Sequence, residues 1–210
     1  MIRPLVYKRI EMPLIVNKDE KIKFICDEAY KEFIEKGIER FTLNKFVLSI
    51  GMSKGQFYHY FPTKEELIFE VISHKYIEII EHIDLKISNA DTFLAKLFAF
   101  FTLYIDNSDE KYIEFNKLMI DSFHMYVNSK NKKIRDFNKE MYIWIYEKID
   151  ELFDEEITKG NLIIESKQFT KSISATADGM YLQSLMIDDY NLKEELSYYL
   201  INIEKLLIKE

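Results

Sequence analysis

The stretch FTLNKFVLSIGMSKGQFYHYFPTKEEL, residues 41–67, predicts two short helices followed by the start of a long one. Thr42 is a favourable N-cap for the first helix. Gly51 ends that helix, because glycine adopts the left-handed backbone conformation without steric cost. Ser53 is the N-cap of the second helix, and Pro62 prevents its continuation because proline lacks a backbone N–H group.

Two short helices joined by a glycine-containing turn have the spacing of a helix-turn-helix. Five apolar side chains are placed to lock the two helices together: Phe46, Ile50, Met52, Phe57 and Tyr60. Five other side chains then face outward from the second helix: Ser53, Lys54, Gln56, Tyr58 and His59. These groups are of the kind that a recognition helix presents to the major groove of DNA.

The distribution of charge singles out the same segment. Of the 210 residues, 29 are basic and 36 acidic, which gives a formal net charge of −7. No carboxylate side chain, however, lies between Arg40 and Lys64. A basic, acid-free strip in an acidic protein is typical of a protein that binds a polyanion. Chance clustering on a solvated face would give the same pattern, so the charge alone leaves both interpretations open.

The composition excludes several classes of protein. Hydrophobic residues make up 48% of the chain and charged residues 31%, which is typical of a globular domain and excludes intrinsic disorder. Only 5 glycines and 3 prolines favour long helices over a turn-rich β-sandwich. The single cysteine, Cys26, permits no internal disulfide and is consistent with a cytoplasmic protein. The longest nearly apolar run, residues 93–105, is too short to span a membrane, and no signal peptide is recognised.

Apolar residues recur at helical spacing through the rest of the chain, and no convincing strand interrupts them. The predicted fold class is therefore all-α, with about nine helices. The predicted helices span residues 18–36, 43–49, 53–60, 63–87, 95–106, 110–126 and 132–158, followed by two helices that end near residues 184 and 207.

Residues 29–37, AYKEFIEKG, and residues 41–67 together resemble the N-terminal domain of the TetR family of one-component transcriptional regulators. The resemblance implies a sequence-specific, homodimeric repressor that binds double-stranded operator DNA and is released by a small hydrophobic effector. The alternative left open is a ligand-binding helical bundle of the same fold that does not bind an operator. The implied organisation is an N-terminal arm (1–17), within which Met12 is an alternative start, a helix-turn-helix domain (18–65) and an effector-binding and dimerisation domain (66–210).

The resemblance also implies roles for individual residues. Thr42 and Lys64 are expected to contact phosphate at helix N-termini, and the outward side chains of the second helix to contact bases and backbone. The expected DNA-binding residues are Thr42, Ser53, Lys54, Gln56, Tyr58, His59 and Lys64. Two residues depart from the family pattern, since Gln56 replaces the usual Thr and Val47 the usual Ala. Glutamine can pair with adenine through two hydrogen bonds, so we expect Gln56 to change the operator sequence rather than the activity.

Aromatic residues are concentrated between residues 93 and 153, where a pocket between bundle helices would bind a small molecule. Most of these rings are expected to be ordinary core. The residues predicted to line an effector pocket are Phe101, Tyr104, Phe123 and Trp144.

The last two helices, within Ser166–Ile187 and Leu192–Leu207, are predicted to form a four-helix dimer interface. Their small side chains would allow close approach: Ala175, Ala177, Gly179 and Ser184. The apolar stripe of the final helix is expected to face the partner subunit: Leu196, Tyr199, Leu200, Ile203 and Leu207.

No catalytic or metal chemistry is predicted. Glu70, His74, Glu78 and His82 recur every four residues, and we interpret them as a solvated helix face rather than as metal ligands. There is no pair of Glu-x-x-His motifs, no glycine-rich phosphate loop and no nucleophile with a recognisable base. The chain is therefore not expected to be an enzyme, and no cofactor is expected.

Overall fold

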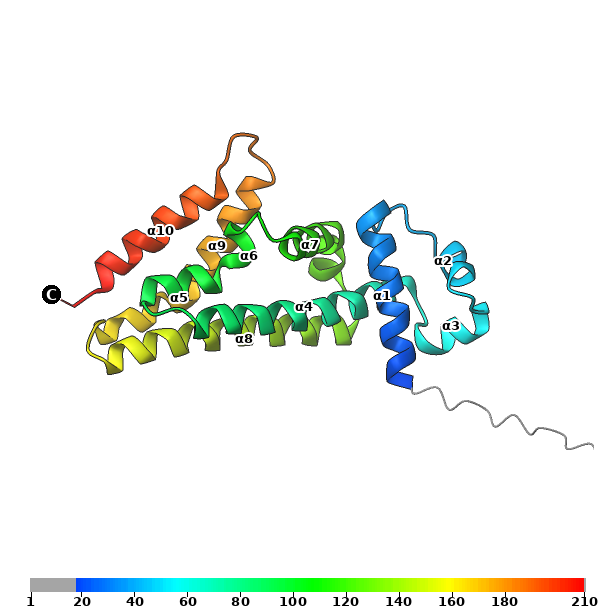
Figure 1. The fold of residues 1–210 in the computed structure, drawn as a ribbon, viewed down its shortest axis with the longest axis horizontal. Helices are drawn as coiled ribbons and strands as arrows, with labels where there is room; N and C mark the ends of the chain where they lie inside the picture. Colours follow the sequence, from blue (N-terminus) through cyan, green and yellow to red (C-terminus); the bar gives the residue numbers. More distant parts are fainter. Residues whose placement is uncertain (1–17, 210) are drawn as a thin grey trace, which may run out of the picture.

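The computed structural model describes residues 18–209, which fold into ten α-helices and one 3-10 helix (Figure 1). In chain order they are α1 (Lys18–Lys36), α2 (Leu43–Ser49), α3 (Lys54–Tyr60), α4 (Lys64–Ser88), α5 (Phe93–Phe100), α6 (Thr102–Ile105), α7 (Glu110–Asn128), α8 (Lys132–Thr158), η1 (Ile164–Phe169), α9 (Thr170–Ser184) and α10 (Leu192–Leu207). Within these residues the only β-type pairing is an isolated bridge between Leu162 and Ile208. The all-α prediction is confirmed. The N-terminal arm predicted over residues 1–17 lies outside the described residues.

Helix boundaries follow the capping signals of the sequence. The side chains of Ser53, Thr63 and Thr92 each accept a hydrogen bond from the backbone N–H three residues later, at the starts of α3, α4 and α5. Gly51, between α2 and α3, has a φ of 69°. An L-residue with a β-carbon is strained in that conformation, so glycine is required in this turn.

The helix predicted over residues 95–106 is divided in two at Phe101, which accounts for a tenth helix. Phe101 has φ −87° and ψ 14°, so the regular helical ladder stops there and restarts in α6. The ammonium of Lys86 on α4 binds the Thr102 hydroxyl and the Asp106 carboxylate, each at 3.0 Å. These contacts fix the short α6 against α4, and the sequence pattern gave no sign of them.

The helices are arranged along one long axis (Figure 1). The long helices α4 and α8 run beside each other along the molecule, and α1, α2 and α3 gather at one end. Helices α9 and α10 lie toward the other end, where the chain ends. Of the helices in the larger part, α4 and α7 both pack against α1. Helices α4 and α7 are therefore the main contacts of α1 with the larger part of the molecule.

The apolar stripe of α10 packs inside the chain. The side chains of Leu196, Leu200 and Leu207 are buried against the rest of the monomer, where α10 contacts α5, α6 and α9. The prediction that this stripe faces a partner subunit is therefore wrong. Helical spacing shows that one face of a helix is buried, but it does not show which element covers that face.

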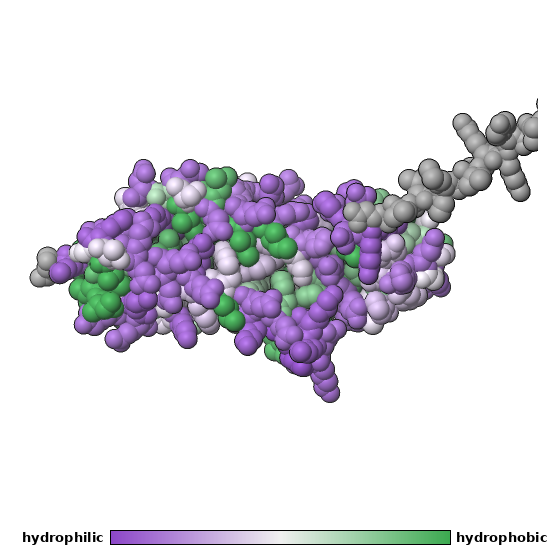
Figure 2. Space-filling view, turned by 90° about the horizontal axis from the view of Figure 1, so that it is seen from below, coloured by the Kyte–Doolittle hydropathy of each residue, from purple (hydrophilic) through white to green (hydrophobic). Residues whose placement is uncertain are grey.

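Most of the surface seen in Figure 2 is hydrophilic, with separate hydrophobic patches. One patch lies at the end of the molecule near the last residue of the chain. Large apolar side chains exposed in the last part of the chain include Met186, Leu206 and Ile208. No helix among residues 18–209 is long and apolar enough to cross a membrane.

Candidate functional site

An aromatic core holds α2 and α3 in a fixed relation. Phe46 of α2 and Phe57 of α3 are buried, and their rings meet edge to face with centroids 6.3 Å apart. Phe41 packs on Phe46 at 5.1 Å, and Met52 is buried in the turn. Edge-to-face packing of this kind contributes about 0.5–1.5 kcal/mol per pair beyond area burial. The locking residues predicted from the sequence are thus confirmed in the core, with Ile50 and Tyr60 packed partly buried against it.

The outward face of α3 is exposed as predicted. Its exposed side chains are Ser53, Lys54, Gln56, Tyr58 and His59. Thr42 is also exposed, and its hydroxyl makes no capping hydrogen bond to α2. The Thr42 hydroxyl is therefore available to a phosphate beside the first turn of α2, where the helix dipole favours an anion.

Gln56 has an internal partner that the sequence prediction missed. Its backbone N–H donates to the Ser53 hydroxyl at 3.2 Å, and its side-chain Oε1 accepts from the Ser53 backbone N–H at 3.0 Å. The two residues form a reciprocal capping box at the start of α3. One of the two acceptor positions of Oε1 is thus occupied within the protein, which restricts the orientations in which Gln56 can pair with adenine. A Ser-x-x-Gln spacing was the available signal.

Lys64 also has a structural partner. Its ammonium donates to the backbone carbonyl of Ile38 at 2.9 Å and to that of Phe41 at 3.0 Å. It also lies 5.4 Å from the centre of the Phe41 ring. Two of the three ammonium donors are thereby used to hold the α1–α2 connection onto the start of α4. The predicted phosphate contact of Lys64 would have to be made with the remaining donor.

Side chains on one face of α7 form hydrogen bonds with the last two turns of α1 and the residue that follows Gly37. Glu114 accepts a hydrogen bond from the Tyr30 hydroxyl, and Lys117 donates to the Ile34 carbonyl at 2.6 Å. Asp121 accepts from the backbone N–H of residue 38 at 3.4 Å. The three α7 residues are spaced by three and four, which places them on the same side of the helix. Sequence analysis missed this contact, because side chains that bind backbone atoms of a distant helix leave no periodic pattern.

The family model described as "Bacterial regulatory proteins, tetR family" matches residues 25–71. This segment begins inside α1 and includes α2, α3 and the first turns of α4. Over this N-terminal segment the chain therefore matches the TetR family. The matching residues therefore include the helix-turn-helix built above.

Comparisons with individual proteins agree with the TetR assignment. An uncharacterized HTH-type transcriptional regulator of Bacillus subtilis, YuxN, is 37% identical over 57 residues, which make up 27% of this chain and 20% of that protein. The chain thus matches only a minor part of that relative's length.

Two solved structures extend the likeness to nearly the whole chain. A transcriptional regulator from Saccharomonospora viridis, solved in complex with choline, has a TM-score of 0.73 at 15% identity and covers 91% of this chain and 100% of its own. A TetR-family regulator from Cytophaga hutchinsonii has a TM-score of 0.75 at 13% identity and covers 92% and 97%. At such identities the likeness shows a shared TetR fold and does not identify a ligand.

Three of the four predicted effector residues lie in one aromatic cluster. Trp144 stacks on Phe100 at 6.0 Å, Phe100 meets Phe101 at 4.9 Å, and Phe101 meets Tyr104 at 6.2 Å. Phe123 does not belong to this cluster, since 52% of it is exposed on α7. The effector contact of Phe123 stays a prediction, for a side chain that lies outside this cluster.

A carboxylate that the sequence analysis did not single out adjoins this cluster. Asp178 of α9 accepts hydrogen bonds from the hydroxyls of Tyr104 at 2.7 Å and Tyr142 at 3.1 Å. Tyr181 packs on Tyr104 at 5.4 Å. Burial raises the pKa of Tyr142 and of Tyr181 to about 12, and raises the pKa of Tyr104 well above its usual range. All three phenols are therefore protonated at neutral pH.

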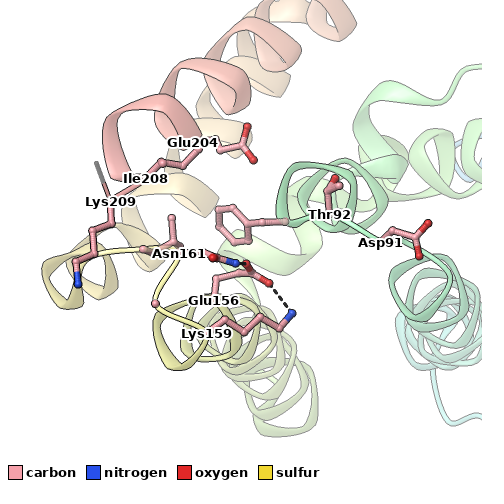
Figure 3. A pocket seen from close by; sticks show the side chains of 11 residues that line it. Asp91, Thr92, Glu156, Lys159, Asn161, Glu204, Ile208 and Lys209 are labelled. Atoms are coloured by element: carbon pink, nitrogen blue, oxygen red, sulfur yellow. Dashed lines mark hydrogen bonds and ion pairs between the residues drawn. The ribbon is translucent and has the colours of Figure 1, made fainter.

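Two cavities lie away from this cluster. The larger, about 430 Å³, is at the end of the molecule remote from α1–α3, between the start of α5, the end of α8 with the segment that follows it, and the end of α10 (Figure 3). Charged side chains surround it, and the carboxylate of Glu156 is bound there by Lys159 and Asn161 at 2.9 Å and 2.6 Å. The smaller, about 130 Å³, lies between α1, α4 and α7 beside the Tyr30–Glu114 contact.

The row of acidic and histidine side chains along α4 does not converge. His74 pairs with Glu70 at 3.6 Å, whereas His82 turns to the Tyr112 hydroxyl at 3.2 Å. Within residues 18–209, no group of three or more His, Cys, Asp or Glu side chains is arranged to hold a metal ion.

Proposed function

We propose that this TetR-family chain is a sequence-specific transcriptional repressor that binds operator DNA and is released by a small-molecule effector. The observation that carries the proposal is the exposed face of α3, held rigidly on α2 within a segment free of carboxylates. A rigid polar helix with a basic surround meets the requirements for insertion into the major groove.

The DNA contacts divide by role. Lys54, Tyr58 and His59 are exposed on α3 and would contact bases and backbone. Thr42 would bind phosphate at the N-terminus of α2. Gln56 would order the start of α3 and offer DNA chiefly its amide donors. In this proposal residues 18–65 form the DNA-binding domain and residues 66–210 the effector-binding and dimerisation domain.

The dimer would form on the outer faces of α9 and α10. Along α9 and the turn after it, residues spaced by three and four are exposed or half-buried and are small or apolar: Ala175, Gly179, Leu182 and, beyond the last residue of α9, Met186. On α10 the corresponding outward residues include Tyr198, 56% exposed, and Leu206, 74% exposed. Surfaces of this kind are typical of a subunit interface. A twofold dimer would place two recognition helices on successive half-sites.

Effector release would act through α4 and α7. Helix α4 runs without interruption from the DNA-binding end into the aromatic cluster, and α7 holds the end of α1. An effector shifts the equilibrium between two arrangements only by its preference for one of them. A tenfold preference in each of two subunits would weaken operator binding by about 100-fold, or about 2.7 kcal/mol. The regulator from S. viridis shows that one protein of this fold binds a small organic cation.

The test is a binding titration of the purified full chain with DNA flanking its own gene and with random DNA of equal length. A repressor binds the flanking DNA at least about 1,000-fold more tightly at physiological salt. Equal affinity for the two DNAs would contradict the proposal. It would instead favour the alternative of a ligand-binding bundle without an operator.

A further inference from the structure

Asp178 is a half-buried carboxylate with acceptor capacity to spare. Its two oxygens each accept one hydrogen bond, from Tyr104 of α6 and from Tyr142 of α8. A carboxylate offers about four acceptor positions, so about two remain unused. Among residues 18–209, no basic side chain forms an ion pair with it. A partly desolvated negative charge without a counter-charge is costly unless a cation joins it.

The walls around this carboxylate are aromatic. Tyr104 contacts Tyr181 at 5.4 Å on one side, and Tyr142 contacts Tyr146 at 6.0 Å on the other. The faces of aromatic rings carry partial negative charge and attract cations. The ammonium of Lys171 already lies over the Tyr146 ring, 5.5 Å from its centre. This tyrosine wall therefore attracts a cation within the protein itself.

An orphaned hydroxyl lies in the same cluster. The hydroxyl oxygen of Tyr181 is buried and has no hydrogen-bond partner. The hydroxyl oxygen of Tyr76 is also buried without a partner, and the Tyr76 ring lies 6.2 Å from that of Trp144 at the opposite end of the aromatic cluster. Leaving a buried hydroxyl unpaired costs about 1–3 kcal/mol. Two such hydroxyls at the ends of one chain of aromatic contacts fit a site whose polar groups are completed by a ligand.

We propose that the effector is an organic cation whose ammonium group binds Asp178 among Tyr104, Tyr142 and Tyr181, with its apolar part against the Phe101–Trp144 rings. This inference rests on the proposed function and names its effector class. Tyr142 is 38% exposed, so the cluster reaches the surface beside Asp178. A neutral molecule of the same shape would gain the aromatic contacts without the charge-assisted bond.

The experiment compares phenylalkylammonium ions having one to four methylenes with the phenylalkyl alcohols of equal length. Binding to the purified full chain is measured by calorimetry and by the fluorescence of Trp144, the only tryptophan in the chain. We expect at least one ammonium ion to bind about tenfold or more tightly than its alcohol, because an ionic hydrogen bond replaces a neutral one. Equal affinities across the series would overturn the proposal.

Three variants locate the effect. Asp178→Asn keeps the shape and an acceptor for the tyrosines but removes the charge, so the preference for ammonium should vanish. Asp178→Glu restores the charge and should restore the preference. Asp188→Asn, on the exposed connection between α9 and α10, is the matched control and should bind like wild type. Retention of the full preference in Asp178→Asn would move the site elsewhere. If that variant does not fold, the ratio of ammonium to alcohol affinity in the wild type decides.

Operator binding is measured in the same preparations, which separates the two proposals. Specific DNA binding together with equal affinity for ammonium ions and alcohols would contradict the effector class and leave the repressor intact. A preference for ammonium that depends on Asp178, without specific DNA binding, would support the cation site and contradict the repressor.

Discussion

Lys117 of α7 donates a hydrogen bond of 2.6 Å to the backbone carbonyl of Ile34, in the last turn of α1. The last carbonyls of a helix have no partner within the helix, and a cation there is also favoured by the helix dipole. Lys117 of α7 thus caps the C-terminal end of α1. Together with Glu114 and Asp121 it makes α7 a second mechanical link beside the covalent connection through α4.

Replacing Lys117 should loosen this link without unfolding the protein. Lys117→Ala is expected to lower the free energy of unfolding by no more than about 1 kcal/mol, because the ammonium is exposed. Hydrogen exchange should become faster at residues 33–38, since the cap on the end of α1 is lost. Lys139→Ala, an exposed lysine of α8, serves as the control and should leave exchange in α1 unchanged. Unchanged exchange in Lys117→Ala would show that the contacts of Glu114 and Asp121 are sufficient to hold the end of α1.

Local signals predicted the DNA-binding end of this molecule well. The signals there are local: each influences the backbone only a few residues away. They are the capping residues Ser53 and Thr63, the turn glycine Gly51 and the apolar positions of α2 and α3. Their effects therefore depend little on the rest of the fold. The break at Phe101 is different, because it accompanies contacts made by Lys86 from a distant helix.

Long-range relations explain what the sequence could not show. Asp178 and Tyr104 are separated by 74 residues, and nothing local to either residue indicates that they meet. The apolar stripe of α10 was predicted correctly, but it was assigned to the interface with a partner subunit. In the structure it packs against α5, α6 and α9 of the same chain.

Variants of Gln56 can distinguish a role in capping α3 from a role in recognising a DNA base. Gln56→Ala removes half of the capping box and is expected to cost about 0.5–1 kcal/mol of stability. It should weaken binding to operator and random DNA alike, because the start of α3 loses order. Gln56→Glu keeps an acceptor for the Ser53 N–H and should retain stability, yet weaken all DNA binding by placing a negative charge toward phosphate. A loss confined to the operator in Gln56→Ala would show that Gln56 reads a base.

Lys54 and Lys64 should behave differently despite their shared charge. Lys54 is exposed at the start of α3, so Lys54→Ala should reduce the salt dependence of DNA binding by about one phosphate per subunit with little change in stability. Lys64 binds two backbone carbonyls, so Lys64→Ala should lower the free energy of unfolding by about 1–3 kcal/mol. Salt titrations and thermal unfolding measure the two effects. The reverse pattern, with a stable Lys64→Ala that loses a phosphate contact, would return Lys64 to the DNA interface.

Leu200 and Leu206 separate folding from dimerisation on a single helix. Leu200 is 0% exposed inside the chain, whereas Leu206, on the outer face of α10, is 74% exposed. Leu200→Glu places an unpaired charge in the core and should prevent folding, visible as lost helical circular dichroism. Leu206→Glu should fold normally but weaken the proposed dimer, because the two charges would be buried in the subunit interface. Light scattering of Leu206→Glu should then show monomers of half the wild-type mass. A folded Leu206→Glu that stays dimeric at micromolar concentration would place the interface on another surface, with the exposed apolar residues of α9 next to be tested.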